Sequence, residues 1–497
     1  MTDVVLGVDV GTTATKAQAL DAAGRVHAEA SRPHALEVRA PGRAEQDPRA
    51  VAAATRAAIA ETVAVSRPPV AGLALSGAMH SLIGVGRGGE ALTPSVTWAD
   101  TRATPQAERL RASPDGPALH ARTGTPVHPM SPLVKLRWFA EAQPGLFRRV
   151  RTWAGIKEWI VHDLTGAWAT DHSIASGTGL MALASRDWDP GALAYAGIDA
   201  SALPALVPTD AALPLAARAA DALGLPAGLP VVVGAGDGPL ANVGAGAVRP
   251  GVAACSAGTS GALRVVVERP SVDPGRSVFC YALTPGRWVV GGAINNGGVV
   301  LDWAADALTP DLGPEPHEAL LVLAARAPAG CDGLLMLPAL LSERAPAWSA
   351  VPRGAYVGLT RAHRREHLVR AALEGVAQQL ALVLASVEAA GGEVWAVHGT
   401  GGLTRSAFWR GLLCDVLGRE VAYPPGAQGS AFGAAVLGLW ALGRLPSVEA
   451  GAALVPAGER RRPDPAAAAV YARLRPVFAG LAEALGPAFT ALRPPAT

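Results

Sequence analysis

Lysine is almost absent from this chain of 497 residues. It occurs only at Lys16, Lys135 and Lys157, whereas arginine occurs 40 times (43 basic residues minus 3). Where a composition has replaced lysine nearly everywhere, the lysines that remain suggest a specific need for a compact ammonium group.

Net charge, cysteine and long apolar runs are also scarce. The formal net charge is +2 at pH 7, which argues against nucleic acid or an anionic membrane as the main partner. The four cysteines, Cys255, Cys280, Cys331 and Cys414, lie far apart without metal-ligand spacing, as expected of reduced thiols in a cytoplasmic protein. No basic leader precedes the first apolar segment, and no apolar run is expected to span a bilayer.

What is present indicates a large globular protein. Half of the residues are hydrophobic, and 57 glycines and 41 prolines indicate many turns rather than disorder. Because 497 residues exceed what one hydrophobic core usually serves, we expect at least two domains.

The first motif follows an apolar, β-branched strand at residues 4–10. Glycine at position 11 lets the backbone approach a ligand, and Thr12, Thr13 and Lys16 then surround a small space that suits a phosphate. Asp9 would face the same space, where a carboxylate is useful mainly if Mg²⁺ lies between it and phosphate oxygens. The same tetrapeptide, Asp-x-Gly-Thr, also fits an ordinary hairpin turn.

Two further predicted strands end in residues suited to a ligand. Met79 and His80 follow a buried strand at residues 70–76, and the carboxyl end of a strand in an α/β sheet is well placed for a ligand. His80 is interpreted as a substrate contact, with a core histidine as the alternative. Trp98 ends a hairpin-like pair at residues 82–85 and 93–98.

A carboxylate lies between two glycines after the predicted strand at residues 229–233. Asp237 is therefore open to close approach by a ligand, as a general base must be, since it has to come within about 3 Å of the proton it accepts. The alternative is a turn-forming aspartate without a catalytic function.

The second half of the chain repeats the opening plan. Residues 251–267 again read as strand, Gly-Thr turn and strand, which predicts two similar domains facing each other across a cleft that holds a nucleotide's phosphates. A strand at residues 394–398 then leads into a glycine-rich helix start, which can hold the adenosine and phosphate parts of a nucleotide.

One metal-like pattern is interpreted differently. Residues 363–367 read His-Arg-Arg-Glu-His, which matches the His-x-x-Glu-His spacing of zinc peptidases. The dense charge indicates the solvated first turn of a helix, and the sequence offers no evident third ligand. We therefore expect no zinc site.

The order of these motifs resembles the FGGY carbohydrate kinases, which belong to the actin, sugar-kinase and heat-shock ATPase superfamily. The resemblance runs from about residue 4 to residue 442. Within the family, six segments are most similar to gluconate kinases, and xylulose kinases are the nearest alternative. These segments are residues 79–83, 97–102, 125–132, 156–158, 173–176 and 295–298.

The resemblance implies an α/β fold with two ribonuclease-H-like domains flanking a central cleft. Residues 1–246 would form a sugar-binding domain and residues 247–497 a nucleotide-binding domain. The implied reaction is ATP-dependent phosphorylation of D-gluconate to 6-phosphogluconate in the cytoplasm, with a homodimer left open. The alternative from another class is a nucleotide-driven conformational ATPase on the same fold.

The resemblance also implies a role for individual residues. Asp237 would be the catalytic base and Asp9 the Mg²⁺ ligand. Where many relatives have arginine this chain has Lys16, so only the charge carries over. The ATP and phosphate contacts would be Thr12, Thr13, Lys16, Thr259, Gly298, Gly402 and Ser406, and the sugar pocket would contain Met79, His80 and Trp98.

The substrate carboxylate needs a cation of its own. Lys157 is one of the rare lysines and lies in the sugar-binding half, so we expect Lys157, or else Arg102, to pair with that carboxylate. Arg102 has a second reading, because Asp100 two residues earlier can form a local salt bridge with it.

Overall fold

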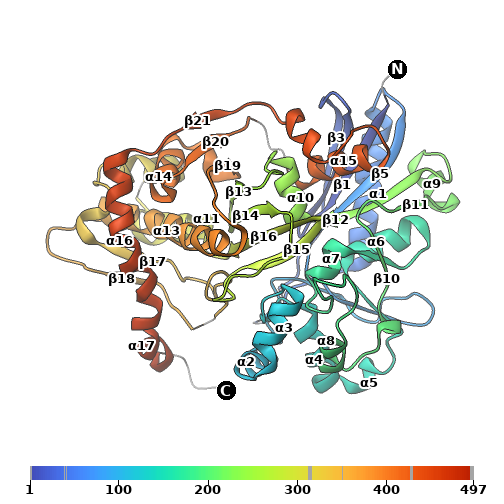
Figure 1. Ribbon diagram of the computed structural model, residues 1–497, viewed down its shortest axis with the longest axis horizontal. Coiled ribbons are helices and arrows are strands. Elements are labelled where there is room, and N and C mark those ends of the chain that lie inside the picture. The colour runs from blue at the N-terminus through green and yellow to red at the C-terminus, as the bar shows by residue number, and fades with distance from the viewer. Residues whose placement is uncertain are drawn as a thin grey trace.

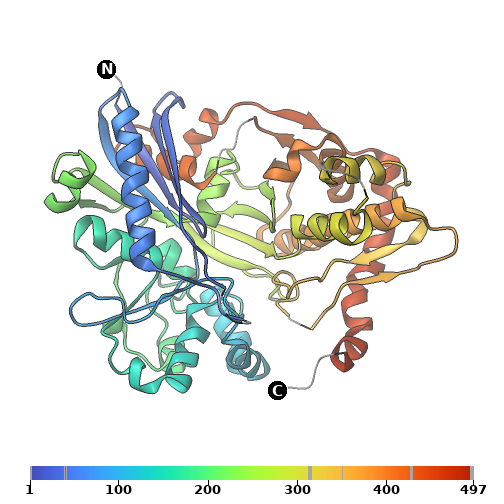
Figure 2. The same ribbon diagram turned by 180° about the vertical axis from the view of Figure 1, so that it is seen from behind.

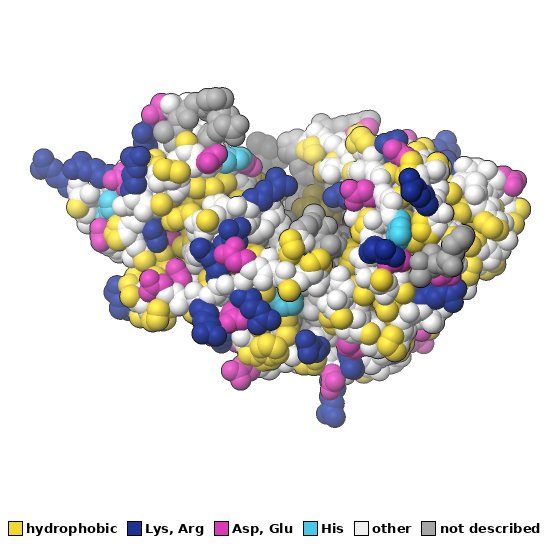
Figure 3. Space-filling model, turned by 90° about the horizontal axis from the view of Figure 1, so that it is seen from above, with side chains coloured by type: hydrophobic (Ala, Val, Ile, Leu, Met, Phe, Trp, Pro, Cys, Tyr) yellow, Lys and Arg dark blue, Asp and Glu magenta, His cyan; other side chains and the backbone are white. Residues whose placement is uncertain are grey.

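The computed structural model describes residues 3–38, 40, 42–311, 316–349, 351–425 and 429–492. Two β-sheets lie in two lobes, with the N-terminal strands in one lobe and most of the second half of the chain in the other (Figure 1). From above, the surface is hollowed between the lobes (Figure 3).

The first sheet has six strands in the order β11-β12-β5-β1-β2-β3. Strands β1, β2 and β3 form an antiparallel meander, and β5 and β12 run parallel to β1. The predicted strands at 4–10, 70–76 and 229–233 are therefore confirmed. The strands are β1 (Val4–Val10), β2 (Ala14–Asp21), β3 (Val26–Pro33), β5 (Val70–Gly77), β11 (Ala212–Pro214) and β12 (Pro230–Gly236).

The second sheet repeats this plan, as the echo in the sequence predicted. Strands β13, β14 and β16 are antiparallel neighbours, and β19 and β20 continue the sheet parallel to β13. The strand order is β15-β16-β14-β13-β19-β20-β21. The strands are β13 (Val252–Ala257), β14 (Gly261–Val267), β15 (Phe279–Thr284), β16 (Arg287–Ile294), β19 (Ala396–Thr400), β20 (Glu420–Tyr423) and β21 (Glu459–Arg461).

Alternate residues of the first sheet enter two different cores. Val4 and Leu6 pack in a cluster with α1 (Pro48–Val65), α6 (Ile156–Thr165) and α9 (Ala217–Leu223), and α1 crosses that face in Figure 2. Val5 and Ala74 belong instead to the large core that continues through the second lobe.

The helix covering this second face comes from the far end of the chain. Helix α15 (Ser430–Ala441) packs on β1, β2 and β5 and against α10 (Asp237–Gly244). Glycines make the approach possible: a Cβ at Gly7 would lie 1.9 Å from the carbonyl oxygen of Ala431, and one at Gly433 would lie 2.0 Å from that of Leu240. A C-terminal segment of the chain is therefore held against the first sheet and α10 by close backbone contacts.

The predicted hairpin-like pair at 82–85 and 93–98 is only partly present. Strand β6 (Ile83–Val85) pairs with β8 (Thr152–Ala154), and β7 (Ser95–Val96) pairs with β4 (Glu45–Gln46). A single bridge, Leu82 to Val96, joins the two predicted segments. The strands that pair with β6 and β7 come from distant parts of the sequence, so the spacing of neighbouring residues does not reveal them.

Further helices complete both lobes. In the first half of the chain they are α2 (Thr104–Ala112), α3 (Asp115–Thr123), α4 (Pro132–Ala142), α5 (Pro144–Phe147), α7 (His172–Ser176) and α8 (Pro190–Ala196), and most of them share a separate small core. In the second half they are α11 (Gly298–Leu308), α12 (Pro316–Ala324), α13 (Arg365–Gly391), α14 (Ala407–Leu417), α16 (Pro465–Ala484) and α17 (Gly486–Ala491). A two-stranded sheet pairs β17 (Leu335–Leu337) with β18 (Ala355–Val357), and another pairs β9 (Ala169–Asp171) with β10 (Ala205–Val207).

Helix α13 corrects one expectation about apolar length. It is long and apolar enough to cross a bilayer by length and composition, although no such run was expected from the sequence. Its most apolar window is 78% buried inside the protein, and it packs on β14, β16 and α14. At its first turn, His367 accepts a hydrogen bond from the Arg364 amide, so this histidine caps the helix.

Candidate active site

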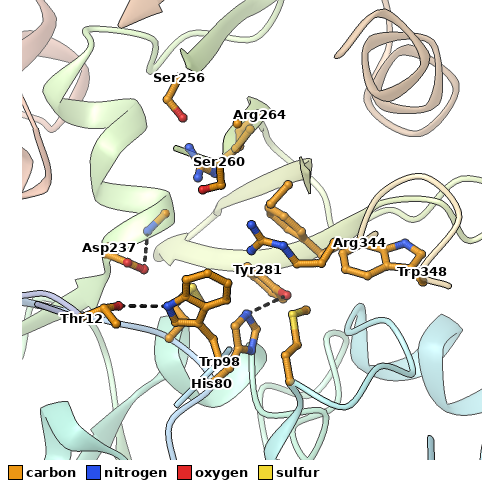
Figure 4. A pocket seen from close by; sticks show the side chains of 17 residues that line it. Thr12, His80, Trp98, Asp237, Ser256, Ser260, Arg264, Tyr281, Arg344 and Trp348 are labelled. Carbon is orange, nitrogen blue, oxygen red and sulfur yellow. Dashed lines mark hydrogen bonds between the residues drawn. The ribbon is translucent and has the colours of Figure 1, made fainter. Parts of the chain in front are cut away.

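A cavity of about 240 Å³ lies between the lobes and receives side chains from both of them. Figure 4 shows these side chains pointing toward one another. The first half of the chain supplies Thr12, Met79, His80, Trp98, Met130, Asp237 and Gly238; the second half supplies Ser256, Ser260, Gly261, Ala262, Arg264, Phe279, Tyr281, Ala293, Arg344 and Trp348.

Asp237 lies in this cavity as the first residue of α10, directly after β12. Burial and the nearby negative charge of Asp9 raise the pKa of Asp237 to about 6, against the opposing effect of the Arg264 guanidinium. Asp9 comes from β1, where it accepts a 2.7 Å hydrogen bond from the Ser76 hydroxyl. A carboxylate with a raised pKa is a stronger base than an ordinary one and is still mostly ionised at pH 7.

His80 presents a hydrogen-bond acceptor to the same cavity. Its Nδ1 lies 2.8 Å from the carbonyl oxygen of Gly177, so Nδ1 carries the proton and Nε2 is free to accept. Burial and the Lys135 ammonium lower the pKa of His80 to about 3. The neutral ring therefore faces Tyr281, whose hydroxyl lies 3.5 Å from Nε2.

Lys135 holds this end of the cavity together. Its buried ammonium donates to the carbonyl oxygens of His80 at 2.7 Å and Thr97 at 2.6 Å. It thus joins the two strand ends that carry His80 and Trp98, and it supports His80 at a positive φ of 66°. Burial lowers the pKa of Lys135 to about 7. In the sequence this lysine stands out only by its rarity, and no role was predicted for it.

Trp98 connects two parts of the cavity. Its indole nitrogen donates a 2.9 Å hydrogen bond to the Thr12 hydroxyl, and the guanidinium carbon of Arg344 lies 4.9 Å from the centre of its ring. Trp98 therefore connects the Thr12 turn between β1 and β2 with the Arg344 guanidinium of the second lobe.

A second, larger cavity of about 890 Å³ lies in the C-terminal lobe. Its polar edge contains the four nucleotide contacts that the resemblance implied, Thr259, Gly298, Gly402 and Ser406. The other side is apolar and of a size that suits a nucleotide base and ribose. It is lined by Leu301, Leu321, Val322, Ala325, Leu403 and Phe408.

The turn between β13 and β14 separates the two cavities. Ser256 and Ser260 of this segment face the first cavity, whereas Gly258 and Thr259 face the second. The amide of Gly298, at the start of α11, donates a 2.7 Å hydrogen bond to the Gly258 carbonyl oxygen. A ligand in the second cavity can therefore reach the first only past this turn.

Comparison with known proteins agrees with this arrangement. Residues 4–244 match the N-terminal domain and residues 253–442 the C-terminal domain of the FGGY family of carbohydrate kinases. The chain belongs to this family.

Individual relatives of this FGGY chain span nearly its whole length. It is 38% identical to the gluconokinase of Bacillus subtilis over 99% of this chain and 98% of that protein. The xylulose kinase of the same organism is 31% identical over 90% of this chain and 89% of its own length. The crystal structure of gluconate kinase from Lactobacillus acidophilus superposes with a TM-score of 0.95, at 33% identity, covering 99% of this chain and all of that one. Membership of a kinase family implies ATP as phosphoryl donor and a small carbohydrate as acceptor.

Several predicted site residues of this FGGY kinase come together, and others do not. Thr12, Met79, His80, Trp98 and Asp237 line the first cavity. Thr13 and Lys16 line neither of the two cavities, and both side chains are exposed.

The two cations expected to meet the substrate carboxylate lie elsewhere. Lys157 is 1% exposed and forms an ion pair with Asp171. Arg102 pairs with Asp100 and Glu45, so the alternative reading of Arg102, a local salt bridge, is the one observed. Both cations are already neutralised by carboxylates of the protein and do not line the cavity.

Sequence reasoning missed Arg264, Tyr281 and Arg344. Arg264 lies in β14 between buried Leu263 and Val265, and a charged residue inside an apolar strand is a signal that could have been used. Tyr281 and Arg344 have no local signal, because the fold brings them to the cavity from β15 and from the loop after β17.

Proposed function

We propose that this FGGY kinase transfers the γ-phosphoryl group of ATP to D-gluconate, forming 6-phosphogluconate. The observation that carries the proposal is the position of Asp237, a base in a polar cavity that only the β13–β14 turn separates from a nucleotide-sized cavity. The similarity to gluconokinase over nearly full length supports gluconate as the acceptor.

In this mechanism Asp237 accepts the proton of the acceptor hydroxyl as the hydroxyl attacks the γ-phosphorus. Ser256, Ser260 and Thr12 offer hydroxyl groups to the transferred phosphoryl group, and His80 and Trp98 orient the sugar. The apolar second cavity would hold the adenosine, with Thr259, Gly298, Gly402 and Ser406 toward the phosphates.

The residues present fit a magnesium ion. Asp9 and Asp237 are close enough for Asp9 to raise the pKa of Asp237, and a divalent cation would relieve that repulsion. We propose Asp9 as its protein ligand, because Mg²⁺ is commonly held by one or two carboxylates together with substrate phosphates. When bound, the ion would neutralise negative charge on the phosphoryl group.

The organisation implied by this function completes the proposal. Residues 1–246 would bind the sugar and residues 247–497 the nucleotide, with closure of the lobes excluding water that would otherwise accept the phosphoryl group. A cytoplasmic enzyme agrees with four free, buried cysteines.

A coupled ATP assay across gluconate, xylulose, ribulose and glycerol tests this function. We expect the highest kcat/KM for gluconate and little ATP turnover without an acceptor. A higher kcat/KM for xylulose would support the xylulose kinase alternative, which the 31% identical relative represents. ATP turnover that is indifferent to small sugars and survives Asp237→Asn would instead indicate a conformational ATPase.

A further inference from the structure

Among the residues that the structure describes, two arginines of the first cavity form no ion pair. Arg264 and Arg344 each have a buried Nε without a hydrogen-bond partner, and neither forms an ion pair with a carboxylate of the described residues. At Arg102 and Lys157 the protein pairs a buried cation with its own carboxylates. Because an unpaired buried guanidinium is strongly destabilising, this cavity is suited to an anionic ligand.

The carboxylate next to Arg344 in sequence is already engaged. Glu343 accepts hydrogen bonds from the amides of Asn295 at 2.6 Å and Arg344 at 2.9 Å, and from the Asn296 side chain at 2.8 Å. The two oxygens of Glu343 therefore fix the loop that carries Arg344 to the end of β16. The Arg344 guanidinium itself donates within the protein only to the carbonyl oxygen of Ile294, at 3.3 Å, among the described contacts.

The two arginines lie at different ends of the cavity. A Cβ at Gly238 would lie 3.4 Å from the Arg264 Nε, so Arg264 is beside Asp237 and the reacting hydroxyl. Arg344 lies over the Trp98 ring, and Figure 4 shows it toward the side of Trp348, across the view from Asp237. A guanidinium stacked on an indole keeps its in-plane N–H groups free for a carboxylate.

We propose that Arg344 binds the carboxylate of the substrate and thereby selects a sugar acid over a neutral sugar. This inference rests on the proposed function. In an acyclic sugar acid the terminal hydroxyl and the carboxylate are at opposite ends, which matches Asp237 at one end of the cavity and Arg344 at the other. Arg264, beside Asp237, would then face the transferred phosphoryl group.

The test compares D-gluconate with D-gluconamide, whose neutral amide replaces the carboxylate at nearly the same size. Wild-type enzyme is expected to favour gluconate by on the order of 100-fold in kcat/KM, as for a buried charged pair. Arg344→Gln should lose most of this preference through a higher KM for gluconate, with a much smaller change for gluconamide. Arg344→Lys keeps the charge and should retain part of the preference.

Arg264→Gln is the matched control. It should lower kcat for both substrates and leave their ratio unchanged. Thermal denaturation adds a readout without turnover: gluconate should raise the Tm of wild type and of Arg264→Gln, but not that of Arg344→Gln.

The outcomes separate two kinds of failure. If wild type phosphorylates neither gluconate nor gluconamide, the proposed function fails and this inference fails with it. If wild type phosphorylates both with equal kcat/KM, gluconate remains a substrate and only this inference is overturned. If wild type prefers gluconate and Arg344→Gln keeps that preference, only the role of Arg344 is overturned. A loss of preference in Arg264→Gln instead would assign the carboxylate to the other arginine and would equally overturn the proposal.

Discussion

The Asp9 carboxylate raises the pKa of Asp237, although the two residues are separated by most of the first half of the chain. Asp9 lies in β1 and Asp237 directly follows β12, and these strands run parallel on either side of β5. Because the carboxyl ends of parallel strands meet at one edge of a sheet, the fold brings these two acidic groups close together, and one of them, Asp237, lines the first cavity.

Replacing Asp237 by Asn should remove most of the kinase activity. The amide cannot accept the proton of the acceptor hydroxyl, so kcat should fall by roughly 10²–10⁴-fold, while binding of ATP stays close to that of wild type. Steady-state kinetics and equilibrium nucleotide titration check this. Activity above about a tenth of wild type would contradict the role of Asp237 as base.

The same substitution should stabilise the metal-free protein at neutral pH. The pKa of Asp237 is raised to about 6 in the folded state. Protonation of Asp237 therefore adds to the free energy of unfolding in full below about pH 4, the pKa of an unfolded aspartate. This contribution is lost as the pH rises through 6. Asp237→Asn should therefore gain on the order of 1–3 kcal/mol over wild type at pH 7 and little at pH 4. Urea unfolding of both proteins in the presence of a chelator, at pH 4 and at pH 7, measures the difference in their free energies of unfolding. The same difference at the two pH values would contradict the prediction.

Lys157→Met should reduce stability without altering substrate selectivity. It would leave the Asp171 carboxylate buried and without its cation, while Asp171 still accepts from the amides of Ser173 and Ile174. We expect a loss of about 3–5 kcal/mol in the free energy of unfolding. The double variant Lys157→Met, Asp171→Asn should recover part of that loss. A stable Lys157→Met protein with a raised KM for gluconate would contradict this prediction and would indicate that Lys157 binds the substrate.

Trp98→Phe should weaken binding of the acceptor. The change removes the hydrogen bond to Thr12 and part of the ring beneath Arg344, so KM for the acceptor should rise roughly 3- to 30-fold. Trp138→Phe is the matched control, since Trp138 packs under Arg102 outside the cavity. A similar KM change in both variants would show that the effect is indirect.

Gly7→Ala should destabilise the packing of α15 on the first sheet. The new methyl would lie 1.9 Å from the carbonyl oxygen of Ala431, so α15 must move, at a cost of about 3 kcal/mol or more. Gly145→Ala serves as control, because a Cβ there meets nothing within 4 Å. Thermal unfolding of the two variants decides, and equal Tm values would show that α15 is not in close contact with β1.

The parts of the site that follow a strand directly could be predicted from the sequence. Asp9, His80 and Asp237 each end or follow a strand, and glycine or hydroxyl neighbours mark them as ligand-facing. The second Gly-Thr turn could be predicted because it repeats the first. These signals are local, and the sheets confirm the strands on which they rest.

The partner of the substrate carboxylate could not be found in the same way. The rarity of lysine drew attention to Lys157, but rarity does not reveal whether a cation faces a ligand or a carboxylate of the protein. Arg344 reaches the cavity from a loop of the other lobe, so its position depends on tertiary contacts such as Glu343 with Asn295 and Asn296.

Helix α15 has a consequence for how the protein is made. It follows the last strand of the sheet that it covers by about two hundred residues in the sequence. Val5, Ala74 and Val232 belong to the core on the face that it covers. During translation the first sheet therefore leaves the ribosome with one apolar side bare, and this side stays uncovered until Ser430–Ala441 has been synthesised. The N-terminal lobe can therefore reach its final state only after helix α15 has left the ribosome.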